Sequence, residues 1–298
     1  MRVSRGCERG GWSVSGEVLR YAAFPAGYAG GNPAGVVLDA CGMTDAEMLA
    51  VAAQVGFSET AFLLPAESAA AGTTNAASAR VRYFSPLAEV SFCGHATIAA
   101  AVARAERHGA GRLDLLTQAG LVPVRTREEG GRLVATLTSV EPSVSPLASD
   151  VLSATLDALG WSPDVLDDAL PPYVAYAGAY HPVLAVGRRQ VLAGLDYDYA
   201  ALAALMAEQS WTTIQLVHRE RPDLFHARDP FPPGGVVEDP ATGAAAAALG
   251  GYLRGLGLVP DSRRVTIRQG EDMGRPSVLL VDIPDNGGVD VTGAAVPL

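Results

Sequence analysis

The chain has 298 residues, and hydrophobic residues make up 49% of them, which is enough to give two ordinary domains a core each. It has 22 lysines and arginines against 32 aspartates and glutamates, a net charge of −10, and the basic residues are scattered. This balance excludes nucleic acid as a partner, because a phosphate backbone needs a basic stripe. The most apolar stretch, residues 241–253, is shorter than the roughly 20 residues of a membrane helix, so we also exclude a membrane partner.

Residues 1–17 are predicted to be a flexible extension, because they begin with arginines but contain no apolar segment typical of a secretory signal. The three cysteines, Cys7, Cys41 and Cys93, form no CxxC pair and no cluster with histidines at zinc spacing. The turn GGNPAG does not match the GxGxxG pattern of dinucleotide sites, and no P-loop motif occurs. We therefore expect a cytoplasmic protein that uses no metal and no cofactor.

The beginning of the fold alternates strand signals with one helix signal. Two apolar segments flank the glycine-rich turn at residues 25–34, which predicts a hairpin. A helix is predicted from Thr44 to Gly56, because Thr44 can cap its start, Glu47 completes a capping box and the glycine ends it. Two strands are expected next, at residues 58–66 and 79–86.

The rest of the chain repeats this plan. Residues 113–137 are rich in strand signals, and residues 150–160 have helical spacing. Two more strands are predicted at residues 212–220 and 223–231, and a turn then leads into an alanine-rich helix.

Two strand-to-helix joints are the most informative features of the sequence. The stretch EVSFCGHATIAAAVA, residues 89–103, starts like a strand and continues as an alanine-rich helix after Gly94. The stretch EDPATGAAAAAL has the same pattern around Gly243, and Glu89 and Glu238 each lie five residues before their glycine. We interpret this as a duplication that gives two similar domains. Free amides at a helix start bind anions, so the two glycines are predicted to hold a carboxylate between them.

Five segments in order, GGNPAGVVL, GFSETAFLL, RYFSPLAEVSFCGHATIAAA, EDPATGAAAAAL and RQGEDMGRPS, resemble the signature segments of the PhzF family, phenazine-biosynthesis-like isomerases with the diaminopimelate-epimerase fold. The resemblance covers nearly everything after Val18. It implies an α/β (α+β) fold of two pseudo-symmetric domains, each a barrel-like, mostly antiparallel sheet around a central helix, with the active site between them. The first domain would comprise residues 18–127 and a C-terminal strand at about 286–298, and the second residues 128–285.

Three residues are predicted to be catalytic. Glu59 lies in an otherwise apolar strand, where burial would raise the pKa of its carboxyl and suit it to taking and returning a proton. A surface glutamate is the alternative, but the resemblance matches Glu59 with the family's acid/base. His95 would otherwise be a core histidine, and it matches a histidine that orients substrate or relays a proton. Asp239 can cap its helix, and it also matches an active-site aspartate that binds a substrate amine or shares in proton transfer.

The resemblance also implies a set of substrate-binding residues: Asn32, Ser58, Cys93, Gly94, Thr242, Gly243 and Ala244. Ala244 departs from the DPATGS of the family's phenazine enzyme and has no hydroxyl, so the identity of the substrate does not carry over. Related epimerases have a catalytic cysteine at the position of Cys93, and a helix start would lower the pKa of its thiol. The second half offers no partner cysteine, so we interpret Cys93 as a small buried residue.

We therefore expect a cofactor-independent isomerase that shifts a proton and a double bond on a small unsaturated carboxylic or amino acid, with Glu59 as general acid/base. The resemblance further implies a homodimer and a role in secondary metabolism, as in antibiotic biosynthesis. One alternative is an epimerase or racemase of a small amino acid that uses Cys93. Another is a noncatalytic relative that binds a small ligand, which the joint retention of Glu59, His95 and Asp239 argues against.

Overall fold

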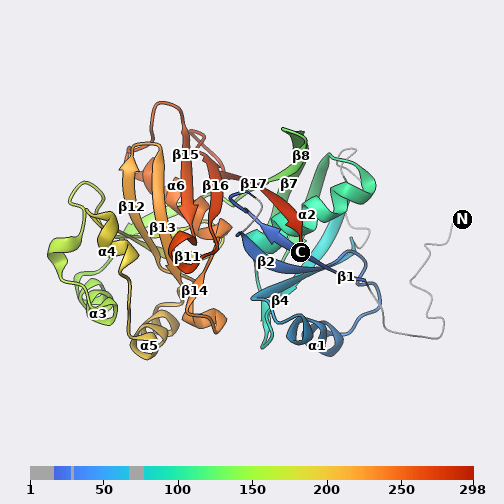
Figure 1. Cartoon of the computed structure of the whole chain (residues 1–298), viewed down its shortest axis with the longest axis horizontal. Helices are drawn as coiled ribbons and strands as arrows, with labels where there is room; N and C mark the ends of the chain where they lie inside the picture. Colours follow the sequence, from blue (N-terminus) through green and yellow to red (C-terminus); the bar gives the residue numbers. More distant parts are fainter. Residues whose placement is uncertain (1–16, 28–29, 67–76) are drawn as a thin grey trace, which may run out of the picture.

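The computed structural model describes residues 17–27, 30–66 and 77–298, so nearly all of the predicted N-terminal extension lies outside the described residues. Two halves lie side by side, and in each a curved sheet surrounds one helix (Figure 1). The helix is α2 (Gly94–His108) in the first half and α6 (Gly243–Gly255) in the second. This arrangement confirms the predicted fold class. No helix of the described chain is long and apolar enough to cross a membrane.

The first half opens with the predicted hairpin, in which β1 (Val18–Ala23) and β2 (Asn32–Val37) pair antiparallel. The predicted helix follows as α1 (Asp45–Val55), with the capping box of Thr44 and Glu47 at its start and a left-handed Gly56 at its end. The remaining strands of this half are β3 (Glu59–Pro65), β4 (Ala77–Phe84), β5 (Glu89–Val90), β6 (Arg112–Thr117), β7 (Gly120–Glu129) and β8 (Arg132–Thr138).

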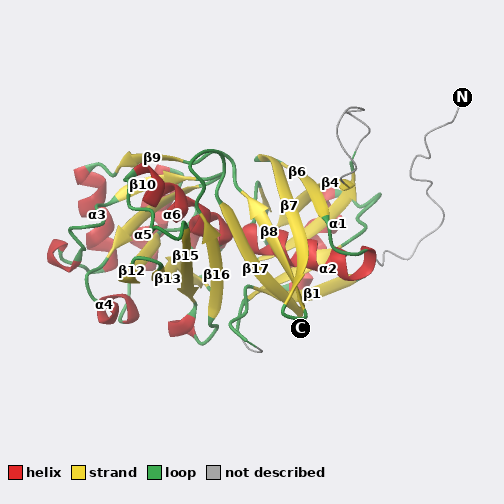
Figure 2. Cartoon of the chain, turned by 90° about the horizontal axis from the view of Figure 1, so that it is seen from above, coloured by secondary structure: helices red, strands yellow, loops and turns green. Residues whose placement is uncertain are grey.

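The second half begins with β9 (Ser143–Pro146) and the predicted helix α3 (Ser149–Leu159). Together with α4 (Arg189–Ala193) and α5 (Tyr199–Gln209), α3 lies at the outer end of this half (Figure 2). The 3₁₀ turns are η1 (Pro163–Val165), η2 (Pro232–Gly234) and η3 (Glu271–Met273). The further strands of the second half are β10 (Tyr173–Tyr176), β11 (Tyr180–Ala185), β12 (Gln215–Arg221), β13 (Leu224–Pro230), β14 (Glu238–Asp239), β15 (Arg264–Gln269) and β16 (Ser277–Asp282).

The last strand, β17 (Asp290–Pro297), joins the two halves. It pairs antiparallel with β16 of the second half, and with β8 and β1 of the first. All strands therefore belong to one hydrogen-bonded sheet. One apolar core includes residues of both central helices, whose alanines let the surrounding strands approach closely. The domain boundaries proposed from the sequence stay predictions.

The predicted duplication is visible in a repeated ion pair. In the first half, Arg82 of β4 contacts Glu89 of β5 through both carboxylate oxygens, at 2.7 and 2.6 Å. In the second half, Arg228 of β13 contacts Glu238 of β14 in the same two-pronged way, at 3.0 and 2.5 Å. The two glutamates noticed in the sequence thus anchor the same strand pair before each central helix.

Candidate active site

The two central helices begin against each other. A Cβ atom added to Gly94 would lie 2.9 Å from the Cα atom of Gly243 and 3.1 Å from the backbone nitrogen of Ala244. No side chain fits at such a distance, so this contact requires glycine at position 94, whereas a Cβ atom at Gly243 would lie a tight 3.3 Å from the Cα atom of Gly94. The structure therefore brings the two predicted helix starts into one place, with their free amides close together.

Glu59, Cys93 and His95 lie together on the side of the first half. Glu59 begins β3 and is only 4% exposed, and its Oε2 atom is 3.4 Å from Nε2 of His95. The Sγ atom of Cys93 is 3.4 Å from Nδ1 of the same ring, and the Oγ atom of Ser58 is 3.4 Å from Nε2. The surface position considered for Glu59 is thus wrong, because the apolar strand carries it into the interior.

Asn32 connects this cluster to Asp239 in the second half. Its Nδ2 atom donates to Oδ1 of Asp239 at 2.6 Å and to the carbonyl oxygen of Ala241 at 3.0 Å. The same nitrogen lies 2.9 Å from Nδ1 of His95. Asn32 is 1% exposed, so the structure places it as a buried bridge between the halves.

Gln269 is a residue of this site that the sequence analysis did not single out. Its Nε2 atom donates to the backbone oxygen of Asp239 at 2.7 Å and to the hydroxyl of Thr242 at 3.0 Å, and its Oε1 atom accepts the amide of Thr242 at 3.1 Å. The Thr242 hydroxyl in turn donates to Oδ2 of Asp239 at 2.6 Å. Gln269 lies in the segment RQGEDMGRPS, which contributes to the family resemblance, but it was not predicted as a site residue.

Burial sets the charge states of these groups. It raises the pKa of Glu59, against hydrogen bonds from Ser58 and Cys93 that lower it. Burial and the nearby charge of Glu59 raise the pKa of Asp239 from 3.8 to about 8. Burial also lowers the pKa of His95 to about 3, so this imidazole is neutral at physiological pH.

Cys93 is buried, as the sequence predicted, but the pKa of its thiol differs from that expected at a helix start. Burial, followed by the charge of Glu59, raises the pKa of its thiol well above the ordinary value. The amide of Ala96 acts in the opposite direction but is outweighed. The lowered pKa considered from the sequence is therefore wrong, because the thiol is 6% exposed and desolvation exceeds the effect of the helix.

The fold also brings together donors of a kind that bind metals. One ligand atom each of Glu59, Cys93 and His95 lies within 4.8 Å of the others, although their sequence spacing gave no sign of such a cluster. The same three groups can serve proton transfer without a cation, because each can hold or accept a proton.

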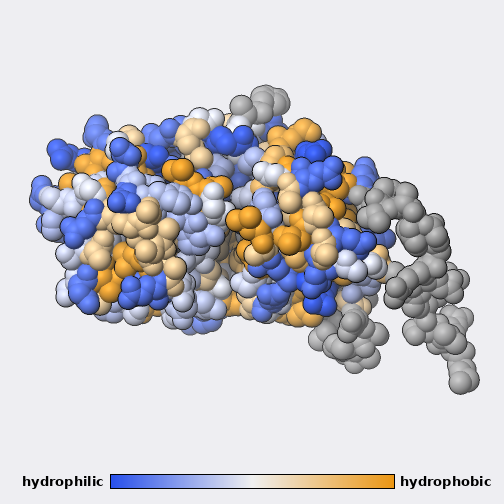
Figure 3. Space-filling view, turned by 90° about the horizontal axis from the view of Figure 1, so that it is seen from below, coloured by the Kyte–Doolittle hydropathy of each residue, from blue (hydrophilic) through white to orange (hydrophobic). Residues whose placement is uncertain are grey.

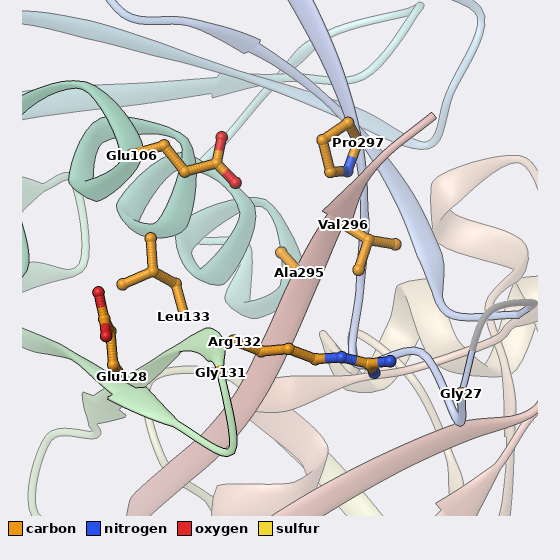
Figure 4. A pocket seen from close by; sticks show the side chains of 9 residues that line it. All are labelled: Gly27, Glu106, Glu128, Gly131, Arg132, Leu133, Ala295, Val296 and Pro297. Carbon is orange, nitrogen blue, oxygen red and sulfur yellow. The ribbon is translucent and has the colours of Figure 1, made fainter.

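The remaining site residue, Ala244, is buried in the first turn of α6, and its backbone nitrogen lies at the contact between Gly94 and Gly243. A separate pocket of about 560 Å³ lies between α2, the β7–β8 hairpin and β17, where Glu106, Arg132 and Pro297 line it (Figure 4). It contains none of the site residues. Hydrophilic and hydrophobic residues are intermixed over the face seen in Figure 3.

The family description "Phenazine biosynthesis-like protein" (PhzC-PhzF) matches residues 21–298, nearly the whole described fold. The chain belongs to the PhzF family. It is 31% identical to the uncharacterized isomerase YfhB of Bacillus subtilis, over 94% of this chain and 96% of that protein. It is 30% identical to a trans-2,3-dihydro-3-hydroxyanthranilate isomerase of Pseudomonas chlororaphis, over 84% of each. Because these relatives are named isomerases and the chain matches the same family over nearly its whole length, this PhzF family member is an isomerase.

Solved structures agree with this assignment. A PhzF-family phenazine biosynthesis protein of Bacillus anthracis superimposes with a TM-score of 0.79 at 26% identity, over 94% of this chain and 96% of that one. A hydroxyproline epimerase of Agrobacterium vitis superimposes with a TM-score of 0.63 at 16% identity, over 94% and 90% of the two chains. The second likeness shows that the PhzF family member shares its fold with epimerases.

Proposed function

We propose that the chain is a cofactor-independent isomerase that moves a proton, and with it a double bond, on a small unsaturated carboxylic or amino acid. Glu59 is the general acid/base. The observation that carries this proposal is a buried carboxyl with a raised pKa, 3.4 Å from a neutral His95, beside the meeting point of two helix starts. A raised pKa suits a group that must both remove and return a proton near neutral pH.

Glu59 and Asp239 supply two carboxyls whose ionisation is coupled. The charge of Glu59 raises the pKa of Asp239, so the state with one proton shared between the two groups is favoured over the doubly charged one. Ionised Glu59 removes a proton from a C–H bond, and the freed electron pair shifts the double bond. The proton returns from Glu59 to the far end of the shifted bond, while protonated Asp239 holds a polar group of the substrate.

The helix starts stabilise the negative charge. A substrate carboxylate next to Gly94 and Gly243 would receive backbone N–H groups from both halves, because the glycines let the two helix starts meet. Charge that develops on the carboxylate during proton removal is then held by dipoles already in place. The names of the relatives support a ring-bearing acid and a role in secondary metabolism as part of the proposal.

Proton NMR in deuterated water tests the proposal. The protein is mixed with trans-2,3-dihydro-3-hydroxyanthranilate and with a panel of unsaturated cyclic amino acids, without any cofactor. We expect the double bond of one acid to move and deuterium to enter at carbon, and Glu59→Gln to lower the rate by at least ~10²-fold in a folded protein. Near-normal turnover by this variant would refute the role of Glu59. Loss of turnover after dialysis against EDTA, reversed by a metal, would refute the cofactor-free mechanism.

A further inference from the structure

Three buried side chains on neighbouring strands of the second half have polar atoms that no group of the described chain satisfies. They are Nε2 of His181, Oδ1 of Asp229, and both amide atoms of Gln215. All three residues are 0% exposed. Leaving such an atom without a partner is costly, so four of them on neighbouring strands indicate partners outside the described chain, either water molecules or groups of a ligand.

The strand register puts these side chains on one face of the sheet. Val183 of β11 pairs with Gln215, and His181 lies two residues earlier on the same strand and therefore on the same face. Leu216 pairs with Arg228, so the next pair in this antiparallel register is Gln215 with Asp229. The face points inward, because Val183 and other residues along it belong to the core around α6.

A short chain of hydrogen bonds fixes what this cluster offers. The hydroxyl of Thr213 donates to Oδ2 of Asp229 at 3.4 Å, so it must accept the proton on Nδ1 of His181, 2.9 Å away. In the neutral ring the unsatisfied Nε2 atom is then an acceptor. With Oε1 of Gln215 the cluster presents two acceptors, beside the Gln215 amide donor and the carboxyl of Asp229, whose pKa burial raises well above its ordinary value. This set fits a ligand group that carries hydrogen-bond donors.

The cluster is continuous with the candidate active site. Asp229 pairs directly with Asp239 across β13 and β14, so the two side chains share a face. Burial raises the pKa of Asp229 well above its ordinary value, as it raises that of Asp239, and the Thr242 hydroxyl, whose proton goes to Asp239, opposes both rises. Arg228 is on the opposite face, where it is held by Glu238. No positive side chain of the described residues is shown to neutralise Asp229.

The duplication indicates that the cluster of His181, Gln215 and Asp229 binds a substrate group and does not transfer a proton. The repeated ion pairs make Arg228 the counterpart of Arg82. Arg82 pairs with Phe62, and Arg228 pairs with Leu216. Glu59 lies three residues before Phe62, and Thr213 lies three residues before Leu216. The second half therefore has a threonine where the first has its acid/base carboxyl, and Thr213 cannot exchange protons near neutral pH.

We propose that His181, Gln215 and Asp229 form a substrate subsite that binds a hydrogen-bond-donating substituent, such as an amino group, while the helix starts hold the carboxylate. The inference rests on the proposed function, because it assigns the second polar contact of the same substrate. It makes these three residues determinants of specificity and not of proton transfer.

Binding of benzoate, anthranilate and 3-aminobenzoate, measured by isothermal titration calorimetry, tests the subsite. These acids share a ring and a carboxylate and differ in the amino group. For the wild type we expect one of the two aminobenzoates, anthranilate or 3-aminobenzoate, to bind about tenfold tighter than benzoate. Gln215→Met and Asp229→Asn should reduce this preference to nearly one while leaving the affinity for benzoate unchanged.

Thermal melts provide the matched control. Gln215→Met removes two amide atoms that lack partners in the described chain, so it should not lower the melting temperature, whereas Gln269→Met removes three hydrogen bonds and should lower it. Equal binding of all three acids by the wild type, or a preference that survives both substitutions, would overturn the subsite and leave the proposed function standing. No binding of any acid, benzoate included, would contradict the carboxylate site itself and the subsite with it.

Discussion

At the scale of single residues, Cys93 and Glu59 belong to one cluster but differ in protonation chemistry. Burial keeps the Cys93 thiol protonated, so it is not a base at neutral pH. We expect Cys93→Ala to retain activity within about tenfold of the wild type, because general acid/base catalysis by Glu59 remains. The measurement is the rate of the double-bond shift on the substrate found by NMR. A folded but inactive variant, together with a wild type that puts deuterium into a stereocentre of the substrate without moving a double bond, would favour the epimerase alternative instead.

Asp239 predicts a pH dependence of stability. Its pKa is 3.8 ordinarily and about 8 in the folded protein, so the folded state binds more protons than the unfolded state between these values. Stability from this group is therefore fully present below pH 3.8 and is lost as the pH rises towards 8. We expect the melting temperature to fall from pH 5 to pH 8, and Asp239→Asn to make that fall smaller. An equal fall in both proteins would contradict the raised pKa.

At this scale the sequence identified those site residues that are marked by their neighbours in the chain. Glu59 stood out as a carboxylate among apolar neighbours, and Gly94 and Gly243 as glycines at helix starts. Gln269 and Gln215 did not, because their importance comes from partners or neighbours on other strands. The burial of Cys93 was interpreted correctly from the sequence, but the direction of its thiol pKa was not, because desolvation by tertiary packing outweighs the helix start.

At the scale of elements, the contact between α2 and α6 depends on Gly94. Alanine normally favours a helix over glycine by up to about 1 kcal/mol, so Gly94→Ala should stabilise an isolated α2. In the protein its Cβ would meet the backbone of Gly243 at 2.9 Å, which has no flexible side chain to move. We expect a lower melting temperature and at least a tenfold loss of activity.

Gly111→Ala is the matched control for this substitution, because a Cβ there meets nothing within 4 Å. It should leave both the melting temperature and the activity close to those of the wild type. A Gly94→Ala protein as stable and active as this control would show that the helix starts do not touch in solution.

The elements themselves were predicted well where caps or alternating patterns mark them. The helix at residues 44–56 and the strands that became β3, β4, β12 and β13 are examples. Helix α5 was not predicted, although Asp198 caps it and accepts the amide of Ala201 at 3.0 Å. The pairing of β17 with strands of both halves lies beyond local patterns, because it joins segments far apart in the chain.

At the scale of the whole molecule, the two halves share both a sheet and a core. Strand β17 bonds to β16 of the second half and to β1 and β8 of the first, so neither half can unfold without breaking its ladder. The main core also runs from the alanines of α2 to those of α6 without interruption. The sequence suggested two domains from its duplication, but the duplication says nothing about how strongly the halves are coupled.

This coupling predicts a single unfolding transition in differential scanning calorimetry, with a calorimetric enthalpy equal to the van't Hoff enthalpy. If one half unfolded first, it would expose the face of α2 or α6 that the shared core buries, and a partly unfolded state would be disfavoured by that apolar exposure. Gly94→Ala should lower the temperature of this transition without splitting it, because the sheet still connects the halves. Two resolved transitions in the wild type would mean that β17 does not couple them. The active site would then lie between independently stable domains, and opening of the interface would be possible without unfolding.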